Sequence, residues 1–535
     1  MTENREVVRV SGLTVRFGQA VVVDSVSLSV AAGECLAIVG ESGSGKTLTA
    51  RALLGLLPDG ASVDVDELVI DGVDARNYSE RDWRRIRGAR VGLVSQDALV
   101  SLDPLRRVGA EVAEVIEIHG ARGSVGRMSR AGIADRVTGM LGRVAVPEPE
   151  ERAQQYPHEL SGGLRQRALI ASALAGEPGI LIADEPTTAL DVTVQAQVLD
   201  LLAGLRADGL GIMVISHDLA VVSGLADRVA VMKDGRIVEE GVTTEVLSRP
   251  QHPYTRMLLA AAPRLGAEAS PIGAAPIVQE VVLEATGLGR DFRRPDGGVR
   301  SAVDAVSLTV RAGAAVGVVG ESGSGKTTLA RLLLGFDTPD RGEVALDGRA
   351  WSGVPERRRR ARRGDIQFIS QDPLGSFDPR FTVARIVAEG LRGDARRASA
   401  AGRATRIRQL LDSVGLDASL ESRRPHELSG GQRQRVAIAR ALASDPRILV
   451  CDEPVSALDV SIQATIIDLL DTLRRDLGVA LVFVSHDLAV VAQLCDEVLV
   501  MQGGRVVESG STDRVFQNPQ HPFTKALVAA VPRMP

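Results

Sequence analysis

Two eight-residue stretches with the identical sequence GESGSGKT occupy residues 40–47 and 320–327. Closely spaced glycines let successive backbone N–H groups close around an anionic phosphate, and the lysine ammonium then reaches the β- and γ-phosphates of a nucleotide. An apolar run typical of a strand precedes each copy, at Leu36–Val39 and Val316–Val319, and helix-like segments begin at Leu48 and Thr328. This strand–loop–helix context predicts two nucleotide-phosphate sites in one chain.

Lysine is rare in this chain: it occurs four times, against 63 lysines and arginines together. Two of the four, Lys46 and Lys326, stand at the same place in the two loops. A compact ammonium enters a ring of backbone amides, which a broad planar guanidinium fits poorly. We therefore expect both lysines to contact phosphate.

A pair of acids ends an apolar run in each half, in ILIADE at 180–185 and in ILVCDE at 448–453. Such runs are typical of buried parallel strands, whose carboxyl ends face the crevice where ligands bind. The first acid of each pair is expected to hold Mg²⁺ together with the loop hydroxyl, as Asp184 with Thr47 and Asp452 with Thr327. The second acid, Glu185 or Glu453, is placed to orient and deprotonate an attacking water. A solvated strand end is the structural alternative.

Two histidines and two glutamines also follow predicted strands. His217 and His486 come after Ile212–Ser216 and Leu481–Ser485, and Gln96 and Gln371 after Val91–Ser95 and Ile366–Ser370. A lone histidine in such a place is usually structural. These two stand at almost the same separation from the metal-binding acid in both halves, so we expect them to contact the γ-phosphate.

A serine and two glycines open a long helix-like segment in each half, in LSGGL at 160–164 and LSGGQ at 428–432. Serine is a good helix N-cap, which is the structural interpretation. The start of a helix also presents bare N–H groups to an anion, which makes a second phosphate site the functional interpretation. One nucleotide does not need two phosphate sites within one domain. If two domains faced each other, the Ser-Gly-Gly segment of each domain would cover the GESGSGKT loop of the other.

The 535 residues are about right for two domains of roughly 250 each. Every motif recurs in the same order, with the second copy 268 to 280 residues after the first. We predict a first domain at 1–265, an Ala/Gly/Pro-rich linker at 266–280 and a second domain at 281–535. Each is predicted to be a parallel α/β core with a helical insert, at about 98–170 and 373–440.

Composition excludes several classes. A formal net charge of −5 and a pI near 5.9 argue against nucleic acid binding, and we interpret the run Arg357–Arg363 as a solvated helix face or loop. The three cysteines, Cys35, Cys451 and Cys495, have no metal-ligand spacing and suggest a reducing compartment. The first residues lack a signal peptide, and no apolar run reaches 18 residues, so we expect a soluble cytoplasmic protein that serves a membrane only by docking.

The order of these motifs resembles the ATP-binding cassette superfamily, from about residue 7 to 264 and again from 282 to 533. The resemblance adds Leu190-Asp191 and Leu458-Asp459 to the pattern and implies two cassette domains in tandem, each with a parallel-sheet core, an antiparallel β subdomain and a helical subdomain. It also implies head-to-tail pairing, with Lys46 facing Ser429 and Gly431 and with Lys326 facing Ser161 and Gly163.

The resemblance assigns roles residue by residue. Water activation, γ-phosphate contact and catalysis would fall to Gln96, Glu185, His217, Gln371, Glu453 and His486. Mg²⁺ would be held by Thr47, Gln96, Asp184, Thr327, Gln371 and Asp452. ATP would be contacted by Phe17, Gly40, Ser42, Gly43, Gly45, Lys46, Thr47, Leu48, Ser161, Gly162, Gly163, Asp191, Phe292, Gly320, Ser322, Gly323, Gly325, Lys326, Thr327, Thr328, Ser429, Gly430, Gly431, Gln432 and Asp459. By position Phe17 and Phe292 resemble the aromatic that stacks on adenine, with core packing as the alternative.

Within that superfamily the chain is most similar to the ATPases of dipeptide, oligopeptide and nickel importers. The similarity lies in SQDALVSLDP and SQDPLGSFDP, in PHELSGG, and in the tails QHPYTRMLLAAAPR and QHPFTKALVAAVPR. It implies an ATPase at the cytoplasmic face of the membrane that pairs with two permease subunits and, through them, an extracytoplasmic solute-binding protein. Di- or oligopeptides are the expected cargo, with nickel chelates, glutathione or sugars as alternatives.

Two departures from the family pattern matter. Some relatives carry a cysteine cluster near the C-terminus, but no cysteine follows Cys495 here, so no iron–sulfur cluster is predicted. Leu164 replaces the signature glutamine in the first half, which predicts two unequal ATP sites. A soluble tandem-cassette translation factor is the remote alternative, although that group has a long charged linker. A DNA-repair cassette protein would need zinc-binding Cys pairs, which the sequence lacks.

Overall fold

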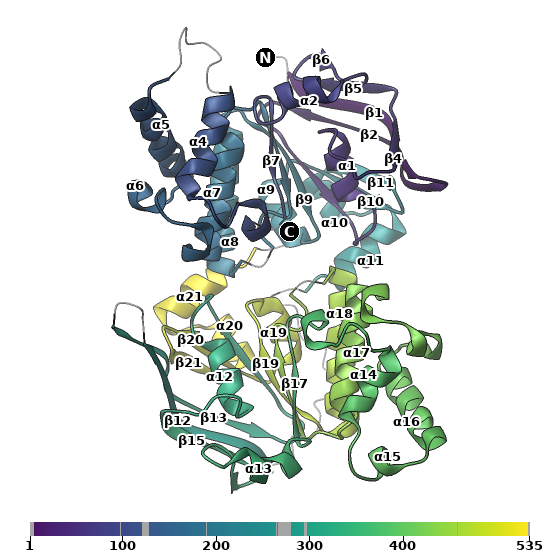
Figure 1. Ribbon diagram of the computed structural model, residues 1–535, viewed down its shortest axis with the longest axis vertical. Coiled ribbons are helices and arrows are strands. Elements are labelled where there is room, and N and C mark those ends of the chain that lie inside the picture. Colours follow the sequence, from purple (N-terminus) through teal and green to yellow (C-terminus); the bar gives the residue numbers. More distant parts are fainter. Residues whose placement is uncertain are drawn as a thin grey trace. The chain divides into compact units, whose positions relative to one another are not determined.

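The computed structural model describes residues 5–96, 98–119, 128–188, 190–263, 265, 280–293, 297–456 and 458–532 (Figure 1). The chain divides into two compact units, of which the first consists mainly of the residues up to Ala262 and the second mainly of Pro263–Val531. Most of the predicted linker, 266–279, lies outside the described residues. No helix in the described ranges has the length and apolarity needed to cross a membrane.

The first unit contains an antiparallel sheet in the order β2-β1-β5-β6, with β4 also paired to β1. Its strands are β1 (Glu6–Phe17), β2 (Ala20–Ala31), β4 (Ala61–Asp64), β5 (Glu67–Ile70) and β6 (Val73–Asp74). Strand β2 alternates buried and more exposed side chains over residues 26–30, because one face packs on the core, whereas β1 is buried in longer runs at 7–8 and 13–15.

A second sheet of the first unit has the order β11-β10-β3-β9-β8-β7 and is parallel except for the β10–β11 hairpin. Its strands are β3 (Cys35–Val39), β7 (Val91–Val94), β8 (Ile180–Asp184), β9 (Gly211–Ser216), β10 (Arg228–Lys233) and β11 (Arg236–Val242). Every residue of β3, β8 and β9 is buried, as expected for central parallel strands covered on both faces.

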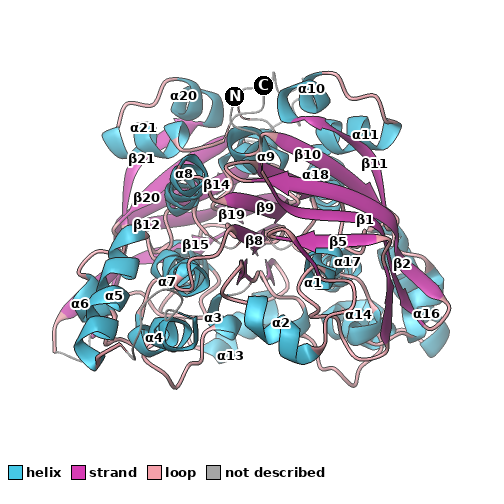
Figure 2. Cartoon of the chain, turned by 90° about the horizontal axis from the view of Figure 1, so that it is seen from above, coloured by secondary structure: helices cyan, strands magenta, loops and turns pink. Residues whose placement is uncertain are grey.

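The helices of the first unit flank this sheet or form the segment between β7 and β8 (Figure 2). They are α1 (Lys46–Ala52), α2 (Glu80–Ile86), α3 (Ala98–Ser101), α4 (Val108–His119), α5 (Arg130–Arg143), α6 (Pro149–Arg152), α7 (Gly162–Leu174), α8 (Val192–Ala207), α9 (Leu219–Leu225), α10 (Thr243–Ser248) and α11 (Pro253–Ala261), with the 3₁₀ turn η1 (Pro157–Glu159). The segment between β7 and β8 shares one core with the parallel strands, and in this core α4, α5 and α7 bury Val112, Leu141 and Ile170.

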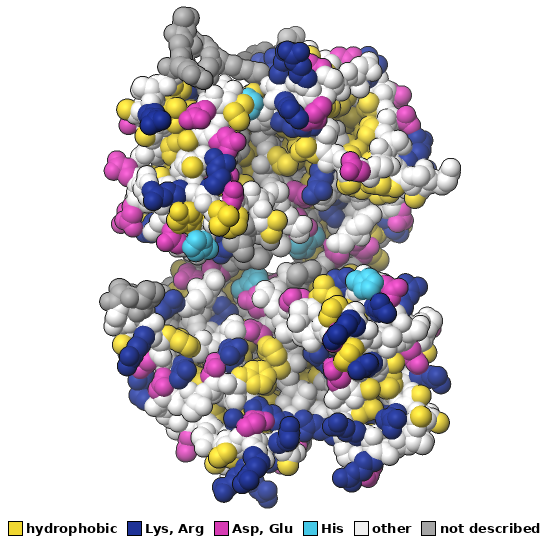
Figure 3. All heavy atoms as spheres, in the orientation of Figure 1, with side chains coloured by type: hydrophobic (Ala, Val, Ile, Leu, Met, Phe, Trp, Pro, Cys, Tyr) yellow, Lys and Arg dark blue, Asp and Glu magenta, His cyan; other side chains and the backbone are white. Residues whose placement is uncertain are grey.

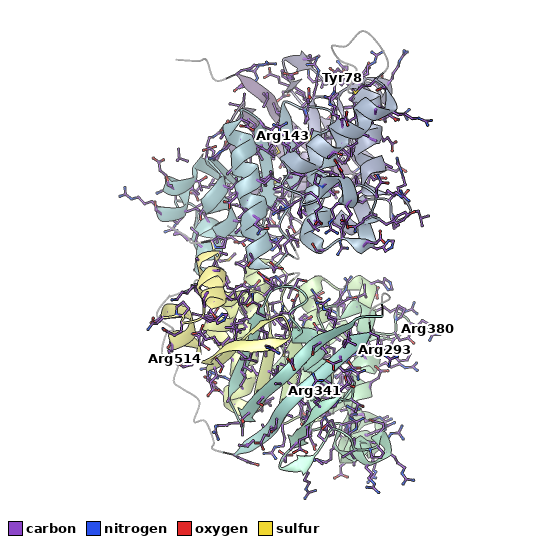
Figure 4. The ribbon with its side chains drawn as sticks, turned by 90° about the vertical axis from the view of Figure 1, so that its left-hand side faces the viewer. Tyr78, Arg143, Arg293, Arg341, Arg380 and Arg514 are labelled. Atoms are coloured by element: carbon purple, nitrogen blue, oxygen red, sulfur yellow. The ribbon has the colours of Figure 1, made fainter. Side chains whose placement is uncertain are left out.

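The second unit repeats both sheets. The antiparallel order is β13-β12-β15-β16 and the other order is β17-β18-β19-β14-β20-β21. The strands are β12 (Val281–Arg293), β13 (Val299–Arg311), β14 (Ala315–Gly320), β15 (Arg341–Leu346), β16 (Arg349–Ala350), β17 (Ile366–Ile369), β18 (Ile448–Asp452), β19 (Ala480–Val484), β20 (Glu497–Gln502) and β21 (Arg505–Ser511). On the antiparallel sheet Arg341, labelled in Figure 4, pairs with Asp291 of the neighbouring strand at 2.7 Å.

The helices of the second unit follow the same order as those of the first. They are α12 (Lys326–Leu333), α13 (Glu356–Arg359), α14 (Val383–Gly390), α15 (Gly393–Arg397), α16 (Ala400–Ser413), α17 (Gly430–Leu442), α18 (Val460–Leu477), α19 (Leu488–Leu494), α20 (Thr512–Gln517) and α21 (Pro522–Ala529), with the 3₁₀ turns η2 (Arg360–Arg362), η3 (Leu374–Ser376), η4 (Ala418–Ser422) and η5 (Pro425–Glu427). The predicted fold class is confirmed: each unit is an α/β parallel core with an antiparallel β part and a helical part.

The expected starts of the two loop helices were wrong by two residues. We expected them at Leu48 and Thr328, but α1 and α12 begin at Lys46 and Lys326. The residue before each helix is a glycine in the left-handed region, with φ of 98° and 106°, so the helix starts directly after the turn. The sequence Pro-Asp-Gly-Gly at 295–298 is a turn signal that predicts a hairpin, and this segment lies partly outside the described residues.

The arginine run of the second unit forms α13 and η2. Arg357, Arg358 and Arg360 are exposed, and basic side chains gather over this part of the surface in Figure 3. Arg359 and Arg363 instead lie over the ring of the buried Trp351, at 5.6 and 5.2 Å from its centroid. The expectation of a solvated face therefore holds for only part of the run, because Arg359 and Arg363 cover an aromatic ring instead.

Candidate functional site

Each GESGSGKT loop joins the end of a buried strand to the start of a helix, β3 to α1 and β14 to α12. Because Lys46 is the first helical residue, the N–H groups of the first turn have no partner within the helix and point along the loop. Such groups, together with the positive end of the helix dipole, favour an anion. The strand–loop–helix arrangement expected of both loops is present, and their binding of phosphate stays a prediction.

The loop lysines point back into their own loops. Lys46 Nζ donates to the carbonyl oxygens of Gly40 and Glu41 at 2.7 and 2.8 Å, and Lys326 Nζ makes the same two bonds at 2.7 and 2.9 Å. Both lysines are buried. Burial lowers the pKa of Lys326, while the charge of Glu453 acts in the opposite direction. Each lysine thus lies within its own loop and hydrogen-bonds two of the loop's carbonyl groups.

A loop hydroxyl meets the first acid of the strand end in both units. Thr47 Oγ1 lies 3.2 Å from Asp184 Oδ1, and Thr327 Oγ1 lies 3.3 Å from Asp452 Oδ1. Burial raises the pKa of both aspartates, against the opposing effect of the threonine hydrogen bond. A buried carboxylate beside a hydroxyl is an all-oxygen donor set of the kind that Mg²⁺ prefers, so these residues fit the expected metal.

The second acid of each pair contacts the glutamine and the histidine predicted for its unit. Glu185 Oε2 accepts from Gln96 Nε2 at 2.8 Å, and Glu185 Oε1 lies 3.0 Å from His217 Nδ1. In the second unit Glu453 Oε2 accepts from Gln371 Nε2 at 2.9 Å, and Glu453 Oε1 lies 3.2 Å from His486 Nδ1. Three side chains that lie far apart in sequence are therefore brought together at the end of one strand.

Backbone strain positions both glutamates. Glu185 and Glu453 have φ of 49° and 48°, in the left-handed region that side chains other than glycine rarely adopt. Their amides donate to Ile215 O and Val484 O of the neighbouring strand at 2.9 Å, which holds this conformation in place. Strain of this kind is typical of functional sites.

The electrostatics of the glutamate–histidine pair are similar in the two units. Burial alone would raise the pKa of each glutamate, but the hydrogen bond and charge of its histidine outweigh this effect and lower it. Burial alone would lower the pKa of His486, but its hydrogen bond to Glu453 raises it. The arrangement therefore keeps the carboxylate ionised and able to accept a proton.

One contact at this site was missed by the sequence reasoning. Thr188 Oγ1 donates to Glu185 Oε2 at 2.9 Å. The matching Ser456 donates instead to the backbone oxygen of Glu453 at 3.1 Å and accepts from Gln371 Nε2 at 3.4 Å. A hydroxyl three residues after the acid in both halves was the available signal.

The Ser-Gly-Gly segments begin α7 and α17, as predicted. Ser161 Oγ accepts from Leu164 N at 3.4 Å, and Ser429 Oγ accepts from Gln432 N at 3.3 Å. The glycines also allow close packing, since a Cβ on Gly431 would lie 2.5 Å from Ile462 Cγ2. Gly162, Gly163, Gly430 and Gly431 thus stand in the first turn of a helix, where N–H groups lack intrahelical partners.

Two phenylalanines and two aspartates are predicted ATP contacts outside these motifs. Phe17 ends β1 and is half-buried against the core, whereas Phe292 lies near the end of β12 with 44% of its surface exposed and Arg290 over its ring. Asp191 directly precedes α8 and Asp459 is the N-cap of α18, and both are buried. Their roles toward ATP stay predictions.

The three cysteines are free and buried, and burial raises the pKa of Cys35 and Cys451 to about 12. Over the described ranges there is no group of three or more His, Cys, Asp or Glu side chains that could hold a metal ion. The expected absence of an iron–sulfur cluster stays a prediction.

Comparison with known families gives two matches in each half of the chain. The ABC transporter family matches residues 23–188 and 303–456. The oligopeptide/dipeptide transporter C-terminal region matches residues 238–287 and 507–535. The second family covers the tails that contain HPYT and HPFT.

Individual relatives match over nearly the whole chain. The peptidoglycan transport ATP-binding protein YejF of Agrobacterium fabrum is 44% identical over 99% of this chain and 97% of its own length. The glutathione import ATP-binding protein GsiA of Salmonella choleraesuis is 42% identical over 99% of this chain and 90% of its own length. Among solved structures, an archaeal ribosome recycling factor in complex with a ribosomal stalk protein is similar with a TM-score of 0.60 and 21% identity, covering 92% of this chain and 88% of its own. At that identity the likeness concerns the fold alone.

Proposed function

The chain belongs to the ATP-binding proteins of ABC transporters, in the peptide and glutathione importer family, and we propose that the cargo it helps to import is di- or oligopeptides. The observation that carries this proposal is the oligopeptide/dipeptide transporter C-terminal region, present once in each half. The relatives are named for glutathione and peptidoglycan. Glutathione is itself a tripeptide and peptidoglycan carries short peptides, so a peptide backbone is common to these cargos.

Uptake by a deletion strain tests the cargo. The strain should fail to grow when short peptides are the sole source of a required amino acid, and expression of this chain should restore growth. Complementation with a Glu185→Gln, Glu453→Gln double variant is the matched control, because that protein should be made but should not turn over ATP. Normal growth on peptides, with loss of glutathione, nickel or sugar uptake, would contradict the proposal and name the alternative.

For ATP hydrolysis we assign the same roles in both units. The phosphate loop and its lysine bind the β- and γ-phosphates, Asp184 and Asp452 with the loop threonines hold Mg²⁺, and the glutamates accept the proton of the attacking water. Bound Mg²⁺ would neutralise charge on the phosphate oxygens. Support comes from the Thr–Asp distance of 3.2 or 3.3 Å and from the ionised carboxylate beside a glutamine and a histidine.

Gln96 and Gln371 are assigned to the water and the metal, and His217 and His486 to the γ-phosphate. Both side chains of each unit already touch the glutamate carboxylate. A bound nucleotide would let these groups divide their hydrogen bonds between the carboxylate and the phosphate. Their removal should therefore lower turnover more than it lowers ATP binding.

We further propose that the two domains, at 1–265 and 281–535, pair head to tail around the linker at 266–280. In this arrangement Lys46 and Ser429 share one ATP, and Lys326 and Ser161 share the other. The proposal rests on the family resemblance and on the two kinds of anion-binding helix start within each unit. Disulfide trapping of cysteines introduced at Ser42 and Ser429 tests it, since the three native cysteines are buried.

The segment after each glutamine is proposed to contact the permease subunits. In the first unit Val100 and Leu105 are 81% and 84% exposed, and in the second Leu374 is 39% exposed. Figure 4 shows Arg380, also in this segment, projecting away from the fold. Apolar side chains held in water favour a partner that covers them.

This contact would place the chain at the cytoplasmic face of the membrane, with an extracytoplasmic solute-binding protein acting through the permease. Co-purification with the permeases encoded beside its gene tests the contact. Val100→Asp with Leu105→Asp should abolish it, whereas the same change at Val63, an exposed valine on the antiparallel sheet, should not. Full retention of the permeases by the double variant would contradict the proposal.

A further inference from the structure

The two phosphate loops have the same sequence, yet different side chains outside the motif hold them. We propose that Tyr254 positions the loop of the first unit and Arg300 positions the loop of the second, so that each sets the ATP affinity of one site. Both are positioning residues, because they contact the loop backbone and act on the nucleotide through it. The inference rests on the assignment of these loops to ATP.

Tyr254 contacts the loop at a peptide that also holds the lysine. Its hydroxyl accepts from Glu41 N at 3.1 Å. The carbonyl oxygen of Glu41 in turn accepts from Lys46 Nζ at 2.8 Å and from Ser44 N at 3.1 Å. One residue of the loop therefore links the tyrosine to the ammonium that would meet the phosphates. Tyr254 is only 4% exposed, so water does not readily replace its hydroxyl.

The tyrosine is itself held firmly. Helix α11 packs Tyr254, Leu258 and Leu259 with Ala37 and Val39 of β3, the strand that leads into the loop. Glu239 accepts from the amides of Gln251 and His252 at 2.7 and 3.0 Å, which fixes the start of the helix.

Two further contacts act on the residue itself. His252 Nδ1 accepts from Tyr254 N at 3.2 Å, and Lys233 Nζ lies 4.9 Å from the centre of the tyrosine ring. A preorganised support of this kind transmits its position to the group that it touches.

The second unit has the same glutamate contacts at the start of its tail helix, but it lacks the tyrosine hydroxyl. Glu508 accepts from Gln520 N and His521 N at 2.9 and 3.0 Å, as Glu239 does in the first unit. The residue at the place of Tyr254 is Phe523, and Gln502 stands at the place of Lys233. A phenyl ring cannot accept the bond that Glu41 N makes in the first unit.

The second loop is held from the opposite side, by the β hairpin. Arg300 Nη2 donates to Gly323 O at 2.9 Å. Arg300 pairs with Phe292 across the hairpin, and the first-unit pair at that place is Phe17 with Ala20, which has no side chain long enough to reach the loop. The Tyr254 and Arg300 contacts are therefore complementary: each is made in one unit and impossible for the residue at the same place in the other.

The test labels the two sites of the full-length protein separately. A protease site is placed in the segment 266–279, the intact chain is photolabelled over a range of 8-azido-ATP concentrations, and it is then cleaved so that each half is read alone. Tyr254→Phe should raise the concentration for half-labelling of the first half by roughly 2- to 13-fold, the range that one hydrogen bond corresponds to, and leave the second half unchanged. Arg300→Ala should do the reverse, near the lower end of that range because the guanidinium is exposed.

Steady-state ATPase measurements should give the matching signature. Both variants should raise the KM for ATP with little change in kcat, because neither side chain reaches the reacting atoms. A general loss of packing would shift both halves together and lower kcat. Unchanged labelling of the first half by Tyr254→Phe, or equal shifts of both halves, would overturn the inference.

Lys46→Ala separates this outcome from a failure of the ATP assignment. If Lys46→Ala abolishes labelling of the first half and Tyr254→Phe does not shift it, the inference on Tyr254 is wrong and the site stands. If Lys46→Ala leaves the labelling intact, the assignment of the site is wrong as well.

Discussion

Helices α7 and α17 begin with the same Ser-Gly-Gly, but only α17 closes a full cap. Gln432 Oε1 accepts from Ser429 N at 3.0 Å while Ser429 Oγ accepts from Gln432 N, which is a reciprocal capping box. In α7 the side chain of Leu164 can accept nothing, and only the serine half of the box is present. Gln432 therefore orders the backbone of Ser429, whereas Leu164 gives Ser161 no such hydrogen bond.

The second difference lies at the glutamates. Glu185 receives a hydroxyl bond from Thr188 in addition to its glutamine and histidine, whereas Ser456 turns its hydroxyl to the backbone. If the domains pair head to tail, the site of Lys46 combines the fully held Glu185 with the fully capped Ser429. Both differences would then favour the same site.

The largest expected effect removes both sites together. Glu185→Gln with Glu453→Gln should lower ATP turnover by about 10²- to 10⁴-fold, because a positioned base is lost from each unit. ATP should still bind and be retained, which filter binding measures. Glu150→Gln with Glu343→Gln is the control pair, since both are exposed glutamates, one in each unit. Normal turnover by the first pair would refute the role of these carboxylates.

The single variants sharpen the comparison between the two sites. Glu185→Gln alone should reduce ATP turnover more than Glu453→Gln alone. The rates of the two single variants should differ by roughly 2- to 13-fold, the range that corresponds to one hydrogen bond in the cap. Leu164→Gln should complete the capping box of α7 and narrow this gap, as measured by steady-state ATPase rates. Leu164→Met, which adds no hydrogen-bonding amide, is the matched control. Equal single variants, or a gap that Leu164→Gln leaves untouched, would show that the cap does not distinguish the sites.

The contact of Thr188 predicts a smaller difference. Thr188→Val keeps the shape but removes the hydroxyl, so it should lower turnover by roughly 2- to 5-fold, within the range for one hydrogen bond, because glutamine and histidine still hold the carboxylate. Ser456→Ala should change the rate less, because its hydroxyl does not donate to the Glu453 carboxylate. If Ser456→Ala were the more damaging change, the proposed asymmetry would run the other way.

The smallest effect concerns pH. Glu453→Gln should lower the pKa of His486, because the hydrogen bond that raises it is removed and burial, which lowers it, remains. NMR titration of the histidine resonances, assigned with His486→Gln, measures this change. A pKa that stays raised in the Glu453→Gln variant would assign the shift to another group.

The same pair has a consequence for stability. The raised pKa of His486 stabilises the fold below pH 6.5, the ordinary pKa of histidine, and this stabilisation is lost as the pH rises through the pKa of the folded protein. The lowered pKa of Glu453 stabilises the fold above pH 4.5, the ordinary pKa of glutamate. The thermal stability lost in Glu453→Gln should therefore be greatest between these two values and shrink toward alkaline pH. A loss of stability that keeps growing as the pH rises above 6.5 would contradict the pairing.

Local patterns predicted much of the fold and of the site. The buried strands before the loops and before the acid pairs are confirmed in type and nearly in extent, because a continuous apolar run of that length is stable mainly as a central parallel strand. The serine N-caps of α7 and α17 are likewise local features. The sequence Ser-x-x-Gln is itself the signature of a capping box, so the contact between Gln432 and Ser429 could have been predicted. Only the consequence of this contact, the inequality of the two ATP sites, was predicted.

Interactions that depend on distant segments were not predictable in this way. Glu41 and Tyr254 are 213 positions apart, and nothing near either residue indicates that a tail helix packs on the strand leading into the loop. The meeting of Gln96, Glu185 and His217 could be expected only because parallel strands bring their carboxyl ends to one edge. Which atoms touch there, and which loop is held by a tyrosine and which by an arginine, follows from the packing of whole elements, since a hydrogen bond forms or fails over a few tenths of an ångström.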